Sequence, residues 1–170
     1  NMVQAMEQWD SSVAAAPEIR TAFFRRRGLV FQNGRRLTQV HKLPELREQD
    51  GAYWVEADGL LVHLRPFGDA APETQRFEFS AREHCFAPAA RYLGYIRVAG
   101  FVMEHAADAF PVPQGGALSA SRGHHWIIED NTVRQVNAVG IDIGLQSWLS
   151  EKAETSGHHI IRRNMIEAFG

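Results

Sequence analysis

The chain contains a single cysteine, Cys85, among its 170 residues, so an internal disulfide framework is excluded. It also lacks an excess of charge of one sign, because the formal net charge is −2. We therefore expect no nucleic-acid partner. No signal peptide is recognised, no apolar run is long enough to cross a membrane, and the start at residues 1–3 is typical of a processing boundary. A membrane partner is not expected either.

Several catalytic motifs are missing as well. The sequence has no phosphate-binding glycine loop, no dinucleotide-binding fingerprint and no nucleophile elbow. His84 precedes Cys85 directly, and neighbouring residues of a strand point to opposite faces, so a Cys/His catalytic pair is not expected. These absences exclude kinase, dehydrogenase and serine-hydrolase functions, and no cofactor is expected.

The second half of the chain does contain an internal repeat. The Gly-His-His phrase at 123–125 returns at 157–159, and each copy leads through a β-rich run to an asparagine, Asn131 or Asn164. A fainter copy covers residues 95–103. No amphipathic helix separates the copies, so strands are expected to stack on strands. This pattern is typical of the coils of a parallel β-helix.

The spacing of the copies predicts a ladder of side chains at one bend. Asn131 is expected to lie over Asn164, so that the two amides satisfy polar groups at a tight internal turn. Gly100 is expected at the equivalent position of the first copy, where it would supply freedom to bend without an amide.

A second strand is predicted in the same register, between the asparagine of one copy and the Gly-His-His phrase of the next. Its apolar residues Ile141 and Ile143 would point inward, and Asp142 between them would point outward with Leu118 beneath it. Asp142 is thereby placed on an exposed sheet face.

The first half of the chain has a different pattern. A short helical or linker segment is expected over 1–22, followed by a small antiparallel β subdomain over 23–90 with hairpin turns at 33–34 and 58–59. The β-helix is then expected over 91–170. The predicted fold class is therefore mainly β, with a small antiparallel subdomain followed by the first coils of a right-handed parallel β-helix.

Four phrases carry a resemblance to a known superfamily; they lie at 30–40, 53–59, 95–101 and 126–131. They resemble the right-handed parallel β-helix proteins related to pectate lyases and β-helical glycoside hydrolases, and the resemblance covers most of the chain. It implies a carbohydrate partner and a secreted or periplasmic location. Proteins of this kind have many more coils, and three coils leave an open apolar end. We expect further C-terminal coils or a homo-oligomer to cover that end.

The resemblance implies a carbohydrate-active protein, most of all a glycoside hydrolase that acts on poly- or oligosaccharides. A polysaccharide lyase and a noncatalytic carbohydrate-binding or structural module are the alternatives, because fold alone does not fix function. A second carboxylate within catalytic distance of Asp142 would favour the enzyme over the noncatalytic module.

The carboxylates of the repeat supply the candidate catalytic residues. Asp142 is preferred, because it would project from a rigid strand beside the loop that carries Gln146 and Trp148. Those two residues are candidates for hydrogen-bonding and stacking a sugar. The alternative for Asp142 is a solvated charge on the outer sheet face.

Glu129 is a second catalytic candidate with a strong structural alternative. One coil later, the positions of Glu129 and Asp130 hold Arg162 and Arg163. Stacking would therefore set acid over base along the outer face, which is typical of structural ion pairs between neighbouring strands.

The paired histidines raise the question of a metal site, which we do not expect. Counted back from the asparagines, the pair at 158–159 is offset by one residue from the pair at 124–125, which favours stacked, solvent-facing histidines. In a lyase, His125 would act as acid or base, with His124 and Arg122 binding the substrate. The structural alternative is that these side chains line a turn.

Overall fold

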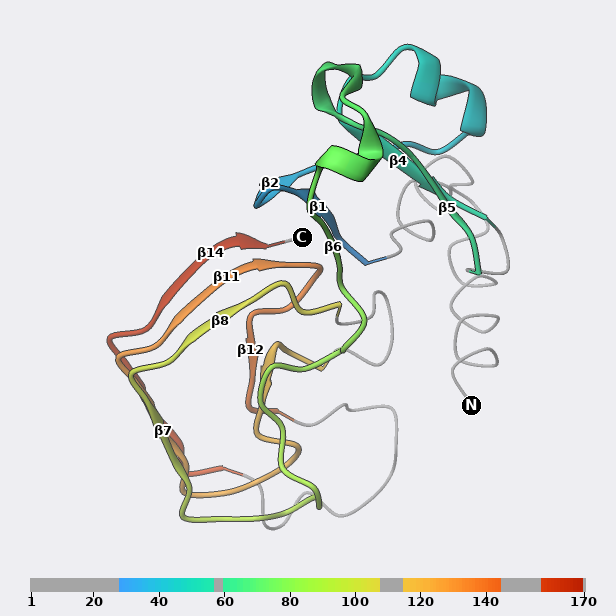
Figure 1. Ribbon diagram of the computed structural model, residues 1–170. Coiled ribbons are helices and arrows are strands. Elements are labelled where there is room, and N and C mark those ends of the chain that lie inside the picture. The colour runs from blue at the N-terminus through green and yellow to red at the C-terminus, as the bar shows by residue number, and fades with distance from the viewer. Residues whose placement is uncertain (1–27, 57–59, 108–114, 145–156, 170) are drawn as a thin grey trace, which may run out of the picture. The chain divides into compact units, whose positions relative to one another are not determined.

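The computed structural model describes residues 28–56, 60–107, 115–144 and 157–169 (Figure 1). The chain forms two compact units that divide between Ser80 and Ala81, upstream of the boundary predicted after residue 90. Strands dominate both units, which confirms the predicted mainly-β fold class. Within these residues, no helix has the length and apolar character that a membrane span requires.

The first unit, called the β subdomain below, contains two three-stranded sheets. One has the order β2-β1-β6 and the other the order β3-β4-β5. The strands are β1 (Val30–Gln32), β2 (Arg35–Arg36), β3 (Thr38–Gln39), β4 (Ala52–Val55), β5 (Val62–Arg65) and β6 (Phe77–Phe79). Three short 3₁₀ helices join them: η1 (Leu43–Arg47), η2 (Phe67–Asp69) and η3 (Pro72–Thr74).

Both predicted hairpins are present in the β subdomain. Asn33 and Gly34 adopt φ values of 51° and 81° between β1 and β2, as a tight hairpin turn requires. Strands β4 and β5 pair antiparallel, and Val55 lies opposite Val62, while the turn residues 57–59 lie outside the described residues. The parallel pairing of β3 with β4 was not predicted.

The second unit is a parallel β-helix. Its strands are β7 (Arg97–Ala99), β8 (Val102–Glu104), β9 (Leu118–Ser119), β10 (Ile127–Glu129), β11 (Thr132–Val136), β12 (Ile141–Asp142), β13 (Ile160–Arg162) and β14 (Met165–Phe169). They form parallel sheets in the orders β7-β10-β13, β8-β11-β14 and β9-β12. Strands β7 and β8 belong to the first coil, β9 to β11 to the second, and β12 to β14 to the third (Figure 1).

The register confirms the stacking of the two asparagines and corrects the position of Gly100. Thr132 lies opposite Met165, so Asn131 lies opposite Asn164 as predicted. In the first coil, however, Thr132 lies opposite Val102, which places Phe101 at the asparagine position. The prediction for Gly100 was wrong by one residue. Its φ of 78° shows that it occupies the left-handed bend before the ladder rather than the ladder itself.

A second register prediction was also wrong by one residue. Ile141 lies opposite Leu118, and Asp142 lies opposite Ser119, so Leu118 is not beneath Asp142. The physical reason is the alternation of a strand: Leu118 is fully buried and must stack on the inward Ile141 rather than on an outward residue. The predicted inward orientation of Ile141 and Ile143 holds, because both contact the apolar core.

Candidate functional site

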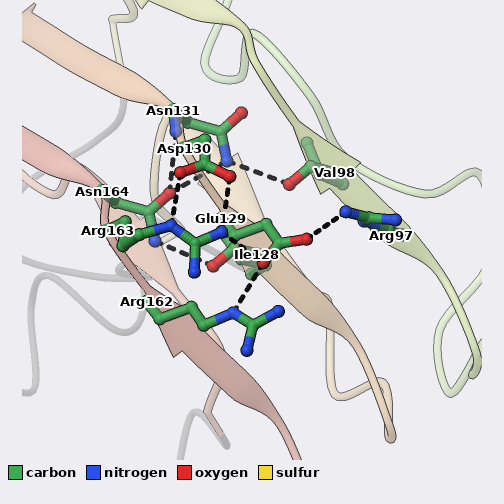
Figure 2. Close-up of polar contacts among 9 residues, drawn as sticks. All are labelled: Arg97, Val98, Ile128, Glu129, Asp130, Asn131, Arg162, Arg163 and Asn164. Atoms are coloured by element: carbon green, nitrogen blue, oxygen red, sulfur yellow. Dashed lines mark hydrogen bonds and ion pairs between the residues drawn. The ribbon is translucent and has the colours of Figure 1, made fainter.

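The asparagine ladder fixes the corner between two faces of the β-helix. The buried Asn131 Nδ2 donates hydrogen bonds to Val98 O and to Asn164 Oδ1, both at 3.0 Å. Its Oδ1 accepts a hydrogen bond from Phe101 N at 3.1 Å, so one side chain contacts the coils on both sides. Asn164 Nδ2 in turn donates to Ile128 O at 2.8 Å (Figure 2). The predicted amide ladder is therefore confirmed.

Glu129 lies at the centre of a carboxylate–arginine cluster that spans three coils (Figure 2). Its side chain is 1% exposed and contacts Arg97 through Oε1. Its Oε2 accepts hydrogen bonds from Arg162 Nε at 2.6 Å and Arg163 Nη2 at 3.0 Å. Asp130 Oδ1 also pairs with Arg163 Nε, at 2.7 Å. The predicted ion pairs between the acidic residues of the second coil and the arginines of the third are therefore present. Arg97 of the first coil adds a further ion pair to Glu129.

The arginines keep both carboxylates ionised. The hydrogen bond from Arg162 lowers the pKa of Glu129, and this effect exceeds the opposing effect of desolvation. The hydrogen bond from Arg163 likewise lowers the pKa of Asp130. A carboxylate held in this way is not suited to donate a proton to a leaving group. These contacts give Glu129 a structural role, and its catalytic role stays a prediction.

The cluster predicts a loss of stability in acid. The pKa of Glu129 in the folded protein lies below its ordinary value of 4.5. The ionised carboxylate therefore contributes its full share to the free energy of unfolding above about pH 4.5, and this contribution disappears as the pH falls through the folded-state pKa. We expect Glu129→Gln to lower the thermal unfolding midpoint at pH 7, and the difference from the unchanged protein to shrink below about pH 4.

Thermal unfolding followed by circular dichroism from pH 7 to pH 3 measures this effect. Glu73→Gln removes an exposed carboxylate of η3 and serves as the matched control, with little change expected at any pH. A constant difference between Glu129→Gln and the unchanged protein across the whole pH range would contradict the ionic role of the cluster.

Four ring side chains gather at the bend before β7, β10 and β13; we call them the aromatic corner. The ring of His125 stacks on Tyr95 with centroids 4.9 Å apart and on His158 at 4.8 Å, so one column crosses three coils. His124 approaches the rings of Tyr95 and His125 edge-on. The three stacked residues have φ between 53° and 60°, and this left-handed bend is one that histidine tolerates better than most residues.

The two histidine pairs are offset by one residue, as the sequence predicts. His124 lies opposite Gly157, so His158 stacks on His125, and His159 Nδ1 lies 3.4 Å from Trp126 N. Burial lowers the pKa of His159. His124 Nδ1 and His125 Nδ1 are 2.9 Å apart and share a hydrogen bond. In the part of the chain that the structure describes, no group of three His, Cys, Asp or Glu side chains is placed to hold a metal ion.

Two of the remaining predicted site residues, Asp142 and Arg122, make hydrogen bonds to residues outside the aromatic corner. Asp142 is half-buried on the β9-β12 sheet, where Oδ2 accepts a hydrogen bond from Gly116 N at 3.0 Å. Arg122 is buried and donates to Tyr92 Oη at 3.3 Å, so it is poorly placed to meet a substrate carboxylate. Gln146 and Trp148 lie outside the described residues.

Comparison with known proteins gives one informative similarity. No protein-family model and no curated protein matches the chain. A solved structure described as the complex structure of XylC with xylose matches with a TM-score of 0.64 and 24% sequence identity. The match covers 84% of this chain and 31% of that chain, so the present chain spans about a third of its length. The similarity shows a shared fold.

Proposed function

We propose that this chain is part of a carbohydrate-binding parallel β-helix protein and that the aromatic corner contacts the sugar. The observation that carries the proposal is the exposed ring column of Tyr95, His125 and His158. The similarity to a structure described in complex with xylose supports a sugar as the ligand. A secreted or periplasmic location would suit a polysaccharide ligand.

The chemistry of the corner suits a sugar ring. Tyr95 is 78% exposed, and an aromatic side chain of this kind offers apolar surface to the C–H groups of a pyranose. The imidazoles beside it supply donors and acceptors for the hydroxyl rim. Because His124 and His125 bond each other through their Nδ1 atoms, their Nε2 atoms are left for a ligand.

The corner is also rigid, as a binding site requires. Its three bends are followed directly by the paired strands β7, β10 and β13, and the bridges of His124 to Gly94 and Gly157 tie the coils together at the bend itself. A rigid platform loses little conformational entropy when a ligand binds.

Tyr95→Ala tests the proposal. We expect it to weaken binding of xylo-oligosaccharides or of the best ligand in a polysaccharide panel by about tenfold, because an aromatic contact is removed. Isothermal titration calorimetry measures the affinity. Phe101→Ala is the matched control, since Phe101 is exposed at the next corner of the same coil and is expected to leave the affinity unchanged. Equal losses from both variants, or no binding across the panel, would overturn the proposal.

A glycoside hydrolase that uses Asp142 is the second candidate function. The observation in its favour is the hydrogen bond from Gly116 N, which holds the Asp142 carboxylate in one position on a paired strand. Its catalytic partner would be a carboxylate on a coil that stacks further along the same face. A lyase is less well supported, because the burial of Arg122 removes the cation that would neutralise a uronate carboxylate.

A further inference from the structure

The outer face of the β7-β10-β13 sheet carries both the aromatic corner and the carboxylate–arginine cluster. Side chains alternate along a strand, so residues two or four positions after the ring column point to the same side as the rings. The residues between them contact the apolar core; they are Ile96, Val98, Trp126 and Ile128. The outward positions of the three strands hold Arg97, Ala99, Ile127, Glu129, Ile160 and Arg162. The rings and the arginines therefore share one surface.

The arginines are close enough to the rings for one oligosaccharide to contact both. Arg97 follows Tyr95 by two residues, which is about 7 Å along an extended strand. Arg162 follows His158 by four residues, or about 13 Å. The outward residues of β10 and β13 between these two rows are isoleucines. A single sugar on the ring column would not reach Arg162, but a chain of sugars laid along the strand direction would.

The surface that a ligand meets at the cluster is cationic. The side chains of Arg97 and Arg162 are 66% and 54% exposed, whereas Glu129 beneath them is 1% exposed. Three arginines share two carboxylates, so the cluster keeps one positive charge. Arg163 donates to both oxygens of Asp130 through Nε and Nη2, each at 2.7 Å. The excess charge therefore lies on Arg97 and Arg162, which share Glu129.

These two arginines also keep unused hydrogen-bond donors. Arg97 contacts Glu129 through Nη2, and Arg162 does so through Nε. Among the residues that the structure describes, their other guanidinium nitrogens have no acceptor. Figure 2 shows the two guanidinium groups approaching the Glu129 carboxylate from different sides. A carboxylate of a ligand that lies over Glu129 can therefore accept hydrogen bonds from both, and the planar fork of arginine suits this acceptor.

We propose that Arg97 and Arg162 form a subsite for the carboxylate of an acidic sugar, so that the ligand of the aromatic corner is an oligosaccharide that contains uronic acid. The inference rests on the proposed function, because it takes a sugar to occupy the rings. A neutral oligosaccharide would leave the excess charge of the arginines unpaired. A uronate further along the oligosaccharide neutralises that charge through charge-assisted hydrogen bonds.

Matched pairs of oligosaccharides test the charge of the ligand. One pair is a neutral xylo-oligosaccharide and the same oligosaccharide with a glucuronic acid substituent; the other is an oligogalacturonate and its methyl ester. We expect the acidic member of at least one pair to bind about tenfold more tightly or better in isothermal titration calorimetry at low salt. The preference should fall to about twofold or less at about 0.5 M salt, because exposed charges are screened. Equal affinities within both pairs, or a preference that salt does not change, would overturn the inference.

Arg97→Gln tests whether the preference comes from this cluster. We expect it to reduce the preference for the acidic member from about tenfold to about twofold or less. Glu129 keeps Arg162 and Arg163 in this variant, so the ion pairs between the second and third coils remain. Arg82→Gln is the matched control, because it removes an exposed arginine of the same unit that lies outside this sheet. An unchanged preference in Arg97→Gln, or the same loss in both variants, would also overturn the inference.

Failure of the arginine subsite and failure of the aromatic corner give different results. If no oligosaccharide binds, the proposed function fails and the subsite fails with it. If acidic and neutral members bind equally and Tyr95→Ala weakens both, the aromatic corner binds neutral sugars and only the arginine subsite is lost. If the acidic preference is lost in Arg97→Gln while Tyr95→Ala changes nothing, the arginine subsite is supported and the aromatic corner is not a sugar site.

Discussion

Asn131→Ala is expected to destabilise the β-helix by about 3 kcal/mol, because it removes the hydrogen bonds that a buried side chain makes to the coils on both sides. Val98 O would lose its donor, and Phe101 N would lose its acceptor. Asn164 Oδ1 would lose the donor Asn131 Nδ2. Water cannot replace these bonds easily, since Asn131 is buried between two coils. The loss should therefore exceed that of an ordinary exposed hydrogen bond.

Urea unfolding followed by far-ultraviolet circular dichroism gives the free energy of unfolding for this comparison. Asn164→Ala is the comparison variant, because it removes the equivalent amide from the third coil, where Asn164 itself is half-buried rather than buried. We expect it to cost less than half as much. If the two variants cost the same, or if Asn131→Ala costs less than about 1 kcal/mol, the ladder is not the main tie between these coils.

The features that the sequence predicted best are those that repeat at a fixed spacing. Asn131 and Asn164 stack because equal spacing in a parallel coil becomes vertical alignment. The same reasoning placed Arg162 over Glu129 and found the one-residue offset of the histidine pairs. In each case two copies share enough residues to fix the register without knowledge of the fold's side-chain contacts.

The first coil was harder, because its copy has diverged and its register rested on Gly100. Asparagine and glycine both favour bends, but here they occupy adjacent positions with different tasks. Gly100 aligns with Asp130 at the left-handed bend, whereas the asparagine position is held by Phe101. The type of residue alone therefore does not distinguish a position with a left-handed backbone from a position whose side chain hydrogen-bonds to the neighbouring coils.

That one-residue error also hid the aromatic corner. With Gly100 placed over Asn131, Tyr95 falls over Trp126, which is fully buried, and no exposed ring column results. In the correct register Tyr95 falls over His125 and stacks on it. A slip of one residue exchanges the inward and outward faces of a strand. The ring residues of the aromatic corner are visible in the sequence, but they can be recognised as a column only when the first and second coils are aligned in the correct register.

The hydrolase hypothesis makes the strongest prediction about activity, and it concerns Asp142→Asn. We expect this substitution to reduce hydrolysis of a poly- or oligosaccharide substrate by about 10²–10⁴-fold, because a carboxylate of the acid/base or nucleophile pair is lost.

A panel of plant and bacterial polysaccharides, followed both by new reducing ends and by the ultraviolet absorbance of unsaturated uronates, measures this directly. Asp130→Asn is the control and should leave the turnover rate unchanged, because its carboxylate pairs with Arg163 away from the Asp142 face. Absorbance of unsaturated uronates would instead indicate a lyase and direct attention to His125. If hydrolysis survives Asp142→Asn, the hydrogen bond from Gly116 N has a structural purpose. In that case Asp142 is not one of the catalytic carboxylates, and the hydrolase hypothesis loses its candidate residue.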